Sequence, residues 1–216
     1  MRILRLDQNT KAEVLSILQE RSPNHDEKVN GIVRGILDEV KEAGDEAVFA
    51  YTKRFDGWGI SAENVRVTED EIEEACQCVD PELYRILEIA CANITEYHQK
   101  QLRSGWFDTK PNGILLGQRI TAMQSAGVYV PGGKAAYPSS TLMNIVPAKV
   151  AGVERIVMVT PAGKDGKVNP GTLAAARIAG VTEIYKVGGA QAVAALAYGT
   201  KTIPKVDKIV GPAIFL

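Results

Sequence analysis

Apolar residues recur with two different periods along the chain, and the period changes near the middle. In the N-terminal part they lie three or four positions apart, which places them on one face of a helix. The clearest series is Val29, Ile32, Val33, Ile36, Leu37 and Val40. Helices are therefore predicted at about residues 8–20, 26–51, 68–78 and 80–104, and Gly44 interrupts the second of them.

From about residue 114 the pattern changes to short continuous apolar runs separated by helical segments. Strands are predicted at 126–130, 155–160, 183–187 and 206–210, with helices at about 139–151, 170–179 and 190–198. The segment from Ile114 to Met123 is predicted to form a strand pair or one bent strand. Continuous apolar strands that alternate with helices are typical of a doubly wound parallel sheet. The predicted fold class is α/β, with an N-terminal helical region followed by a parallel sheet domain.

Several local signals set the expected ends of these helices. Thr68 and Glu71 have the spacing of a capping box, in which each residue satisfies a backbone N–H of the first turn. Pro170 stands at a first helical position and Gly180 just past a helix end, where each residue is favoured. Pro147 is expected to kink or restart the helix that contains it.

Composition indicates an ordinary globular protein of one large or two small domains. The chain has 216 residues, of which 45% are hydrophobic and 24% charged. No apolar run approaches the roughly 18 residues of a membrane span, and no signal-peptide core is visible. Cys76, Cys78 and Cys91 lie in helical sequence, and the C-x-C pair points to different helix faces. Neither a disulfide nor a zinc site is favoured, so we expect a reducing, cytoplasmic location and buried or half-buried thiols.

The net charge of −1 conceals an asymmetry between the two halves. Residues 121–216 contain ten Lys or Arg and four acidic residues, which gives +6 and leaves −7 for residues 1–120. A basic half attracts a phosphate-bearing ligand or docks on the acidic half, and the sequence leaves both readings open. The lysines are scattered without interleaved aromatic residues, so nucleic-acid binding is not expected.

Glycine-rich loops follow three of the predicted strands, in Tyr129–Gly133, Val187–Gln191 and Val210–Pro212. Ligands of open α/β sheets bind beyond the carboxyl ends of the strands, so these loops are expected to converge on one crevice. The first loop reads Tyr129-Val130-Pro131-Gly132-Gly133 and lacks the third glycine of the dinucleotide fingerprint. Its alternative reading is an ordinary strand-to-helix connection.

Two side chains of these loops suit a ligand. Tyr129 can stack on a flat ring or donate its hydroxyl, and the Gln191 amide suits a ribose or phosphate oxygen. The competing interpretation is that Gly188 and Gly189 only allow tight packing and that Gln191 is a solvated helix cap. The spacing alone does not decide between the two.

Residues for acid–base or metal chemistry are scarce. His25 and His98 are the only histidines, and both lie in the helical half. No H-x-x-x-H, metal-ligand cluster or G-x-S-x-G motif is present. The sequence therefore predicts no catalytic residue and no metal ligand in this chain.

Taken together, several stretches resemble the histidinol dehydrogenase family, in order along essentially the whole chain. They are Gly44-Asp45-Glu46-Ala47, Arg54-Phe55-Asp56, Gly127–Gly133, Tyr137–Ser140, Leu142–Asn144, Pro147–Val153, Val187–Ala192 and Ile203–Pro212. The resemblance implies NAD-dependent, two-step oxidation of L-histidinol to L-histidine in histidine biosynthesis. It also implies a zinc-bound homodimer with incomplete Rossmann-like domains, in which the residues matching Tyr129 and Gln191 contact NAD. On that basis the expected cofactor-binding set is Tyr129, Pro131, Gly132, Gly133, Gly188, Gly189 and Gln191.

The resemblance also sets limits. The family's Gly-Pro-Gly-Asn motif, whose asparagine contacts NAD, is here Gly211-Pro212-Ala213-Ile214, and the family's zinc ligands and Glu-His pair match no residue of this sequence. The chain is therefore expected to be an N-terminal portion, inactive alone. Its expected parts are a small N-terminal segment (1–22), an incomplete helix-rich first domain (23–124) and a Rossmann-like domain (125–216). The alternative is a non-catalytic α/β module that binds a nucleotide or a partner protein, and a weaker possibility is complementation by a separate C-terminal half.

Overall fold

A four-stranded parallel sheet forms the centre of the molecule, which confirms the predicted α/β class. The computed structural model describes residues 7, 10–20, 27–132, 137–181 and 183–212. The strands are β3 (Ser125–Tyr129), β4 (Arg155–Val159), β5 (Ile184–Tyr185) and β6 (Lys208–Val210), in the order β5-β4-β3-β6. Tyr129 pairs with Val159, and Val128 pairs with Val210. The chain order reverses between β3 and β6, which makes this point the topological switch of the sheet.

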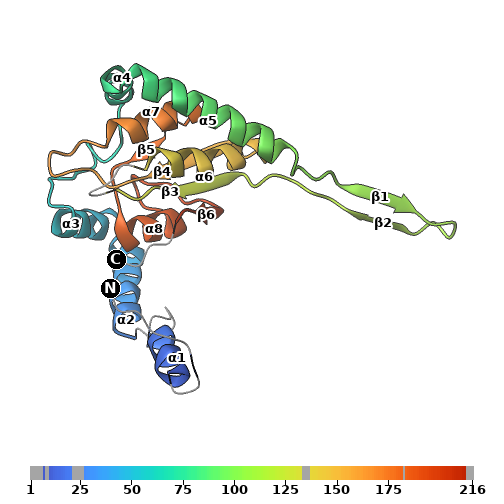
Figure 1. Cartoon of the computed structure of the whole chain (residues 1–216), viewed down its shortest axis with the longest axis horizontal. Helices are drawn as coiled ribbons and strands as arrows, with labels where there is room; N and C mark the ends of the chain where they lie inside the picture. Colours follow the sequence, from blue (N-terminus) through green and yellow to red (C-terminus); the bar gives the residue numbers. More distant parts are fainter. Residues whose placement is uncertain (1–6, 8–9, 21–26, 133–136, 182, 213–216) are drawn as a thin grey trace.

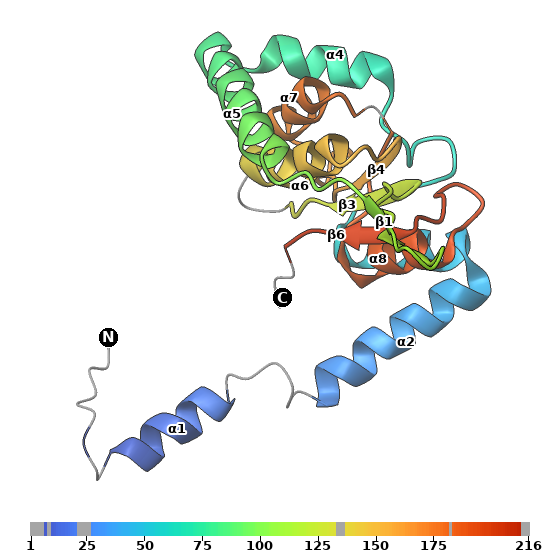
Figure 2. The ribbon, with the colours of Figure 1, turned by 90° about the vertical axis from the view of Figure 1, so that its right-hand side faces the viewer.

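Helices cover both faces of the sheet, as Figure 1 shows. One face carries α4 (Glu69–Cys78), α5 (Pro81–Gln99), α6 (Pro138–Val150) and α7 (Pro170–Ala179). The other carries α2 (Glu27–Ala43), α3 (Asp45–Phe55) and α8 (Gly189–Tyr198). Figure 2 shows α2 beneath α8 and running away from the sheet, with α1 (Lys11–Glu20) beyond it.

Each strand supplies side chains to two separate cores. Along β4, Ile156 and Met158 pack with α6 and α7, whereas Val157 and Val159 pack with α2, α3 and α8. Successive residues of a strand point to opposite faces, so a continuous apolar run is what a sheet covered on both sides requires.

The helical region also extends the sheet. Val67 donates its N–H to the carbonyl of Ile184 at 2.9 Å, and Lys186 donates to Val65 at 2.7 Å. Between them, Arg66 forms an antiparallel bridge with Tyr185. The short strand β5 is thereby covered on its outer edge, where unpaired backbone groups would otherwise remain exposed.

The expected helix signals are in place. Thr68 and Glu71 form both bonds of the capping box at the start of α4. The Asn169 side chain caps α7, Pro170 is its first residue, and Gly180 ends it with a left-handed φ of 77°. Pro147 does not restart its helix, because α6 is continuous from Pro138 to Val150.

A two-stranded hairpin projects far from the body of the molecule (Figure 1). Its strands are β1 (Trp106–Thr109) and β2 (Leu115–Gln118), which pair antiparallel. The prediction for Ile114 to Met123 was wrong in extent, because the turn lies at Lys110–Gly113 and only the second strand falls in that range. The turn is closed by a bond from the N–H of Lys110 to the carbonyl of Ile114 at 2.8 Å, and Gly113 supplies a φ of 82°. Every residue of both strands is exposed.

Smaller differences concern the edges of elements and one thiol. Helix α5 ends at Gln99 rather than near residue 104. Cys76 and Cys91 are half-buried as expected, but Cys78 is exposed on the last turn of α4. His98 lies near the end of α5 and bonds Gln101 at 2.7 Å, whereas His25 lies outside the described residues. No helix in the described part of the chain has the length and apolar character needed to cross a membrane.

Candidate functional site

A large cavity lies beyond the carboxyl ends of the strands, between those loops and α2. Its volume is about 680 Å³. Its walls come from the loop after β3 (Gly132), the loop after β4 (Pro161–Lys164), the start of α8 (Gly189–Gln191), the end of α3 (Phe55, Asp56) and one face of α2 (Val29, Ile32, Val33, Ile36). This is the place where open α/β sheets bind ligands. Its size and mostly apolar lining are those of a small-molecule site.

The three glycine loops lie next to one another, but only the first two line this cavity, so the prediction that all three converge on one crevice is confirmed only in part. The Tyr129 hydroxyl accepts a hydrogen bond from the backbone N–H of Gly189 at 3.2 Å, which joins the end of β3 to the start of α8. A Cβ on Gly211 would lie 2.5 Å from the carbonyl oxygen of Tyr129. The loop after β6 therefore approaches Tyr129 so closely that only glycine fits there.

Pro161 lies between the first two loops and explains two of the glycines. A Cβ on Gly132 would lie 2.6 Å from the Pro161 ring, and a Cβ on Gly188 would lie 2.7 Å from it. The packing interpretation thus applies to Gly188, whose backbone conformation is an ordinary extended one. Gly189 differs, because its φ of 65° favours glycine whatever the neighbours are.

Gln191 is buried, so the interpretation as a solvated cap was wrong. Its exposed fraction is 1%, and α8 has no side-chain cap. Its Oε1 has no hydrogen-bond donor among the described residues. A buried acceptor without a donor costs about 1–3 kcal/mol, which a ligand that supplies a donor would recover.

Asp56 also lines the cavity, and sequence reasoning missed it as a site residue. It ends α3 through its backbone N–H, which donates to Thr52 at 2.8 Å, while its Oδ2 is buried without a donor in the described structure. Burial raises the pKa of this carboxyl. In the sequence, Asp56 was marked only as part of the stretch Arg54-Phe55-Asp56 that carries the family resemblance. The neighbouring residues give no indication that this turn lies near the loops of the sheet.

The predicted cofactor-binding residues divide into three groups. Gly132, Gly189 and Gln191 line the cavity, whereas Tyr129, Pro131 and Gly188 do not. Both Tyr129 and Gly188 contact residues that line the cavity: Tyr129 accepts a hydrogen bond from Gly189, and Gly188 packs against Pro161. Gly133 lies outside the described residues.

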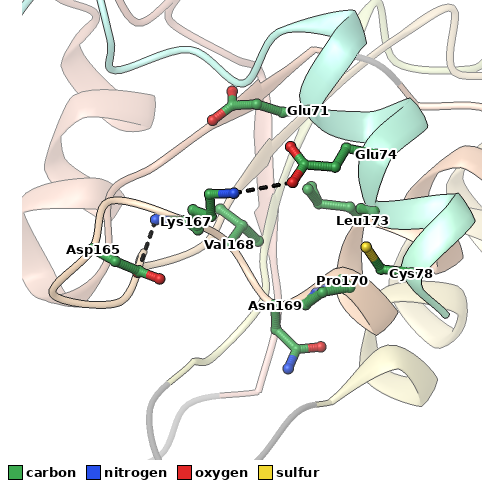
Figure 3. Close-up of a pocket in the computed structure, with 10 residues that line it drawn as sticks. Glu71, Glu74, Cys78, Asp165, Lys167, Val168, Asn169, Pro170 and Leu173 are labelled. Carbon is green, nitrogen blue, oxygen red and sulfur yellow. Dashed lines mark hydrogen bonds and ion pairs between the residues drawn. The ribbon is translucent and has the colours of Figure 1, made fainter.

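A second cavity, of about 320 Å³, lies between α4 and the loop before α7 (Figure 3). Its charged side chains and Asn169 already have protein partners. Lys167 binds Glu74 at 3.0 Å and donates its backbone N–H to Asp165 at 3.1 Å. Glu71 pairs with Lys186, and Asn169 caps α7. Because each charge has a protein partner, this cavity lacks the unsatisfied groups of the first one.

Metal ligands are not gathered at either cavity. Within the described ranges, no group of three or more His, Cys, Asp or Glu is placed to hold a metal ion. The donor sets of these residues therefore do not fit zinc, and none of them is assigned a zinc-dependent role. An NAD molecule differs, because the first cavity offers two buried polar atoms that have no partner among the described residues, together with the exposed cation of Lys164.

An open parallel sheet, helices on both faces and a cavity at the switch point define a doubly wound α/β protein of the Rossmann-like class. The histidinol dehydrogenase family model matches residues 19–215. The chain belongs to the histidinol dehydrogenase family.

Individual relatives agree with that assignment. The chain is 58% identical to a histidinol dehydrogenase of Bacillus licheniformis over 83% of this chain and 42% of the relative. It is 49% identical to that of Listeria innocua over 94% of this chain and 47% of the relative. The crystal structure of histidinol dehydrogenase from Elizabethkingia anophelis superposes with a TM-score of 0.81 and 35% identity, over 86% of this chain and 42% of that one. The chain therefore spans less than half the length of these relatives.

Proposed function

We propose that this chain carries the NAD-binding part of a histidinol dehydrogenase, an enzyme that oxidises L-histidinol to L-histidine in two NAD-dependent steps. The observation that carries the proposal is the cavity at the strand ends, in which Gln191 and Asp56 each present a buried acceptor without a partner in the described structure. A nucleotide suits such a site, because it combines a flat apolar base, hydroxyl donors and phosphates. Family membership supports the reaction, and the homodimer implied by the resemblance is proposed for the complete enzyme.

Different residues of this chain have different roles in NAD binding. The Gln191 amide and the Gly189 turn face the cofactor, and Tyr129 holds the start of α8 in place through its hydroxyl. Lys164 at the rim attracts the phosphates. The apolar face of α2 excludes water from the opposite side. Bound NAD would supply the hydride acceptor for both oxidation steps.

Calorimetric titration with NAD tests the proposal. We expect weak binding by the wild-type chain, and a further loss of about three- to tenfold in Gln191→Ala, because one hydrogen bond is worth about 0.5–1.5 kcal/mol. Tyr129→Phe keeps the ring and removes only the bond to Gly189, so it is the matched control for Tyr129→Ala. Absence of NAD binding by the folded wild-type chain would refute the proposal.

Turnover provides the second test. We expect no NADH formation from L-histidinol by this chain alone, with or without added zinc, because the described residues hold no metal-ligand cluster and the family's Glu-His pair matches no residue of this sequence. The assay follows NADH absorbance against a blank without substrate. NADH formation above that blank would contradict the expectation and would place the chemistry within these residues.

A non-catalytic partner-binding module is the second candidate, and the projecting hairpin favours it. Trp106 and Phe107 are 56% and 65% exposed, and large apolar groups gathered on a surface mark interaction sites. The two candidates separate in the titration, since a pure partner-binding module would bind no NAD.

A further inference from the structure

The carboxyl of Asp56 is unusual among the acids of the described structure. Others near the sheet are engaged: Asp45 accepts from the Thr202 hydroxyl at 2.9 Å, Asp207 from the Ser125 hydroxyl at 2.8 Å, and Glu71 pairs with Lys186. The Oδ2 of Asp56 is buried and has no donor in the part of the chain that the structure describes. Thr52 and Trp58 also carry buried atoms without partners there, but neither residue lines the cavity.

The wall around Asp56 suits a flat ring. Phe55 precedes it and is 53% exposed, and Ile32 of α2 is 55% exposed, although both line the cavity. Val29 and Val33 continue this wall along α2. Half-exposed apolar side chains beside a hollow provide the surface that a planar aromatic base covers on binding.

The sheet itself does not supply the usual acid for a ribose. In doubly wound dinucleotide folds, an Asp or Glu beyond a strand end accepts from the ribose 2′-hydroxyl and disfavours a 2′-phosphate. Here β4, the neighbour of β3, is followed by Thr160 and Pro161. The next acid, Asp165, accepts from its own loop at Lys167 and lines the other cavity.

We propose that Asp56, delivered by the end of α3 rather than by the sheet, accepts the ribose hydroxyls of an adenosine whose base lies against Phe55 and α2. The site then selects nucleotides with a free 2′-hydroxyl, and so NAD over NADP, because a 2′-phosphate would meet the carboxylate. This inference rests on the proposed function of the cavity as the NAD site and assigns one residue within it.

The test compares two ligand pairs on the full 216-residue chain: NAD with NADP, and adenosine 5′-monophosphate with adenosine 2′,5′-bisphosphate. Saturation-transfer difference NMR detects weak binding and reports which ligand protons contact protein methyl groups. For the wild type we expect each free 2′-hydroxyl ligand to bind at least tenfold more tightly than its 2′-phosphate counterpart. We also expect the strongest saturation transfer at the adenine protons, since Val29, Ile32 and Val33 supply methyl groups to this wall.

Two variants isolate the carboxylate. Asp56→Ala is expected to weaken NAD about tenfold or more, because hydrogen bonds to charged groups are among the stronger ones. Asp56→Asn keeps a neutral acceptor, so it should bind NAD better than the alanine variant while its preference over NADP falls at least tenfold. Asp165→Asn removes the same charge from the other cavity and should leave both ratios at the wild-type value. Circular dichroism and thermal melting confirm that each variant is folded.

The outcomes separate the two proposals. If the wild type binds NAD and Asp56→Asn retains the wild-type preference over NADP, Asp56 does not contact the ribose and this inference falls alone. An equal loss of preference in Asp165→Asn would also overturn it, because a general charge effect would then explain the result. If the folded wild type binds none of the four ligands, the proposed NAD site and this inference are both refuted.

Discussion

Substituting Gly188 by alanine should destabilise the protein through a single, identifiable contact. Alanine accepts the backbone conformation at this position, where φ is −124° and ψ is −172°. The added Cβ, however, would lie 2.7 Å from Cβ and 3.0 Å from Cγ of Pro161. A proline ring cannot rotate away as the end of a flexible side chain can. Gly132 also lies against this ring, because a Cβ added there would lie 2.6 Å from Pro161 Cγ.

Overpacking of this kind typically costs about 1–3 kcal/mol. For a chain of this size each kcal/mol shifts Tm by about 2–4 °C, so Gly188→Ala should lower Tm by roughly 2–12 °C. Calorimetry at one scan rate measures this shift. Gly35→Ala is the matched control, because Gly35 lies in the exposed middle of α2 with no atom within 4 Å of the new Cβ. The same substitution there should raise stability by about 0.5–1 kcal/mol.

Opposite signs for one chemical change would establish the Pro161 contact as the reason for Gly188. The double variant Gly188→Ala/Pro161→Ala should recover part of the loss relative to additivity. Equal or higher stability of Gly188→Ala would refute the reasoning. NAD binding that disappears while stability is kept would assign Gly188 to the ligand instead.

Two further predictions concern charge and surface. Burial opposes ionisation of Glu71, but hydrogen bonds from Lys186 and the Thr68 backbone outweigh burial and hold the pKa of Glu71 below the usual 4.5. The ionised Glu71 therefore contributes its full stabilisation above about pH 4.5, and this stabilisation is lost as the pH falls through the lowered pKa. Glu71→Gln should flatten the acid side of the urea-midpoint profile, and an unchanged profile would exclude this pair as a source of the pH dependence. In the hairpin, Trp106→Ser with Phe107→Ser should reduce self-association and dye binding while changing stability by about 0.5 kcal/mol or less. Lys110→Ser, a substitution in the hairpin turn, serves as the control. If light scattering shows undiminished self-association of the double variant, the hairpin is not part of the contact surface.

Local chemistry explains which parts of the fold were predictable. The capping box at Thr68 and the Asn169-Pro170 start of α7 need only neighbouring residues, and both formed as expected. The strand pair was predicted at the wrong position because all residues of both strands are exposed. No alternation of buried and exposed positions therefore marks Trp106–Thr109 as one strand of a pair. For the same reason, the helix predicted over residues 80–104 was too long, since α5 ends at Gln99.

In the candidate site, too, the features that depend on neighbouring residues were predicted and those that depend on distant contacts were not. Glycines after strands pointed to the carboxyl edge of the sheet, and the loops do meet there. Neither the Pro161 ring that separates two of these loops nor the Asp56 carboxyl from α3 follows from local sequence. Both depend on contacts between residues far apart in the chain, which a pattern of neighbouring residues does not encode. Whether the predicted residues bind NAD stays a prediction for the titrations above.

The contacts that join the N-terminal helices to the sheet also bear on how fast the chain folds. Glu71 and Lys186 are separated by 115 residues, and Asp45 and Thr202 by 157. Closing such loops costs entropy before the contacts return any energy, and topologies rich in them fold slowly. Strand β5 gains its outer neighbour only when residues 65–67 arrive from the other end of the chain. Until that step, the edge of the nascent sheet is open to pairing with other chains, so dilute refolding conditions should favour the native product.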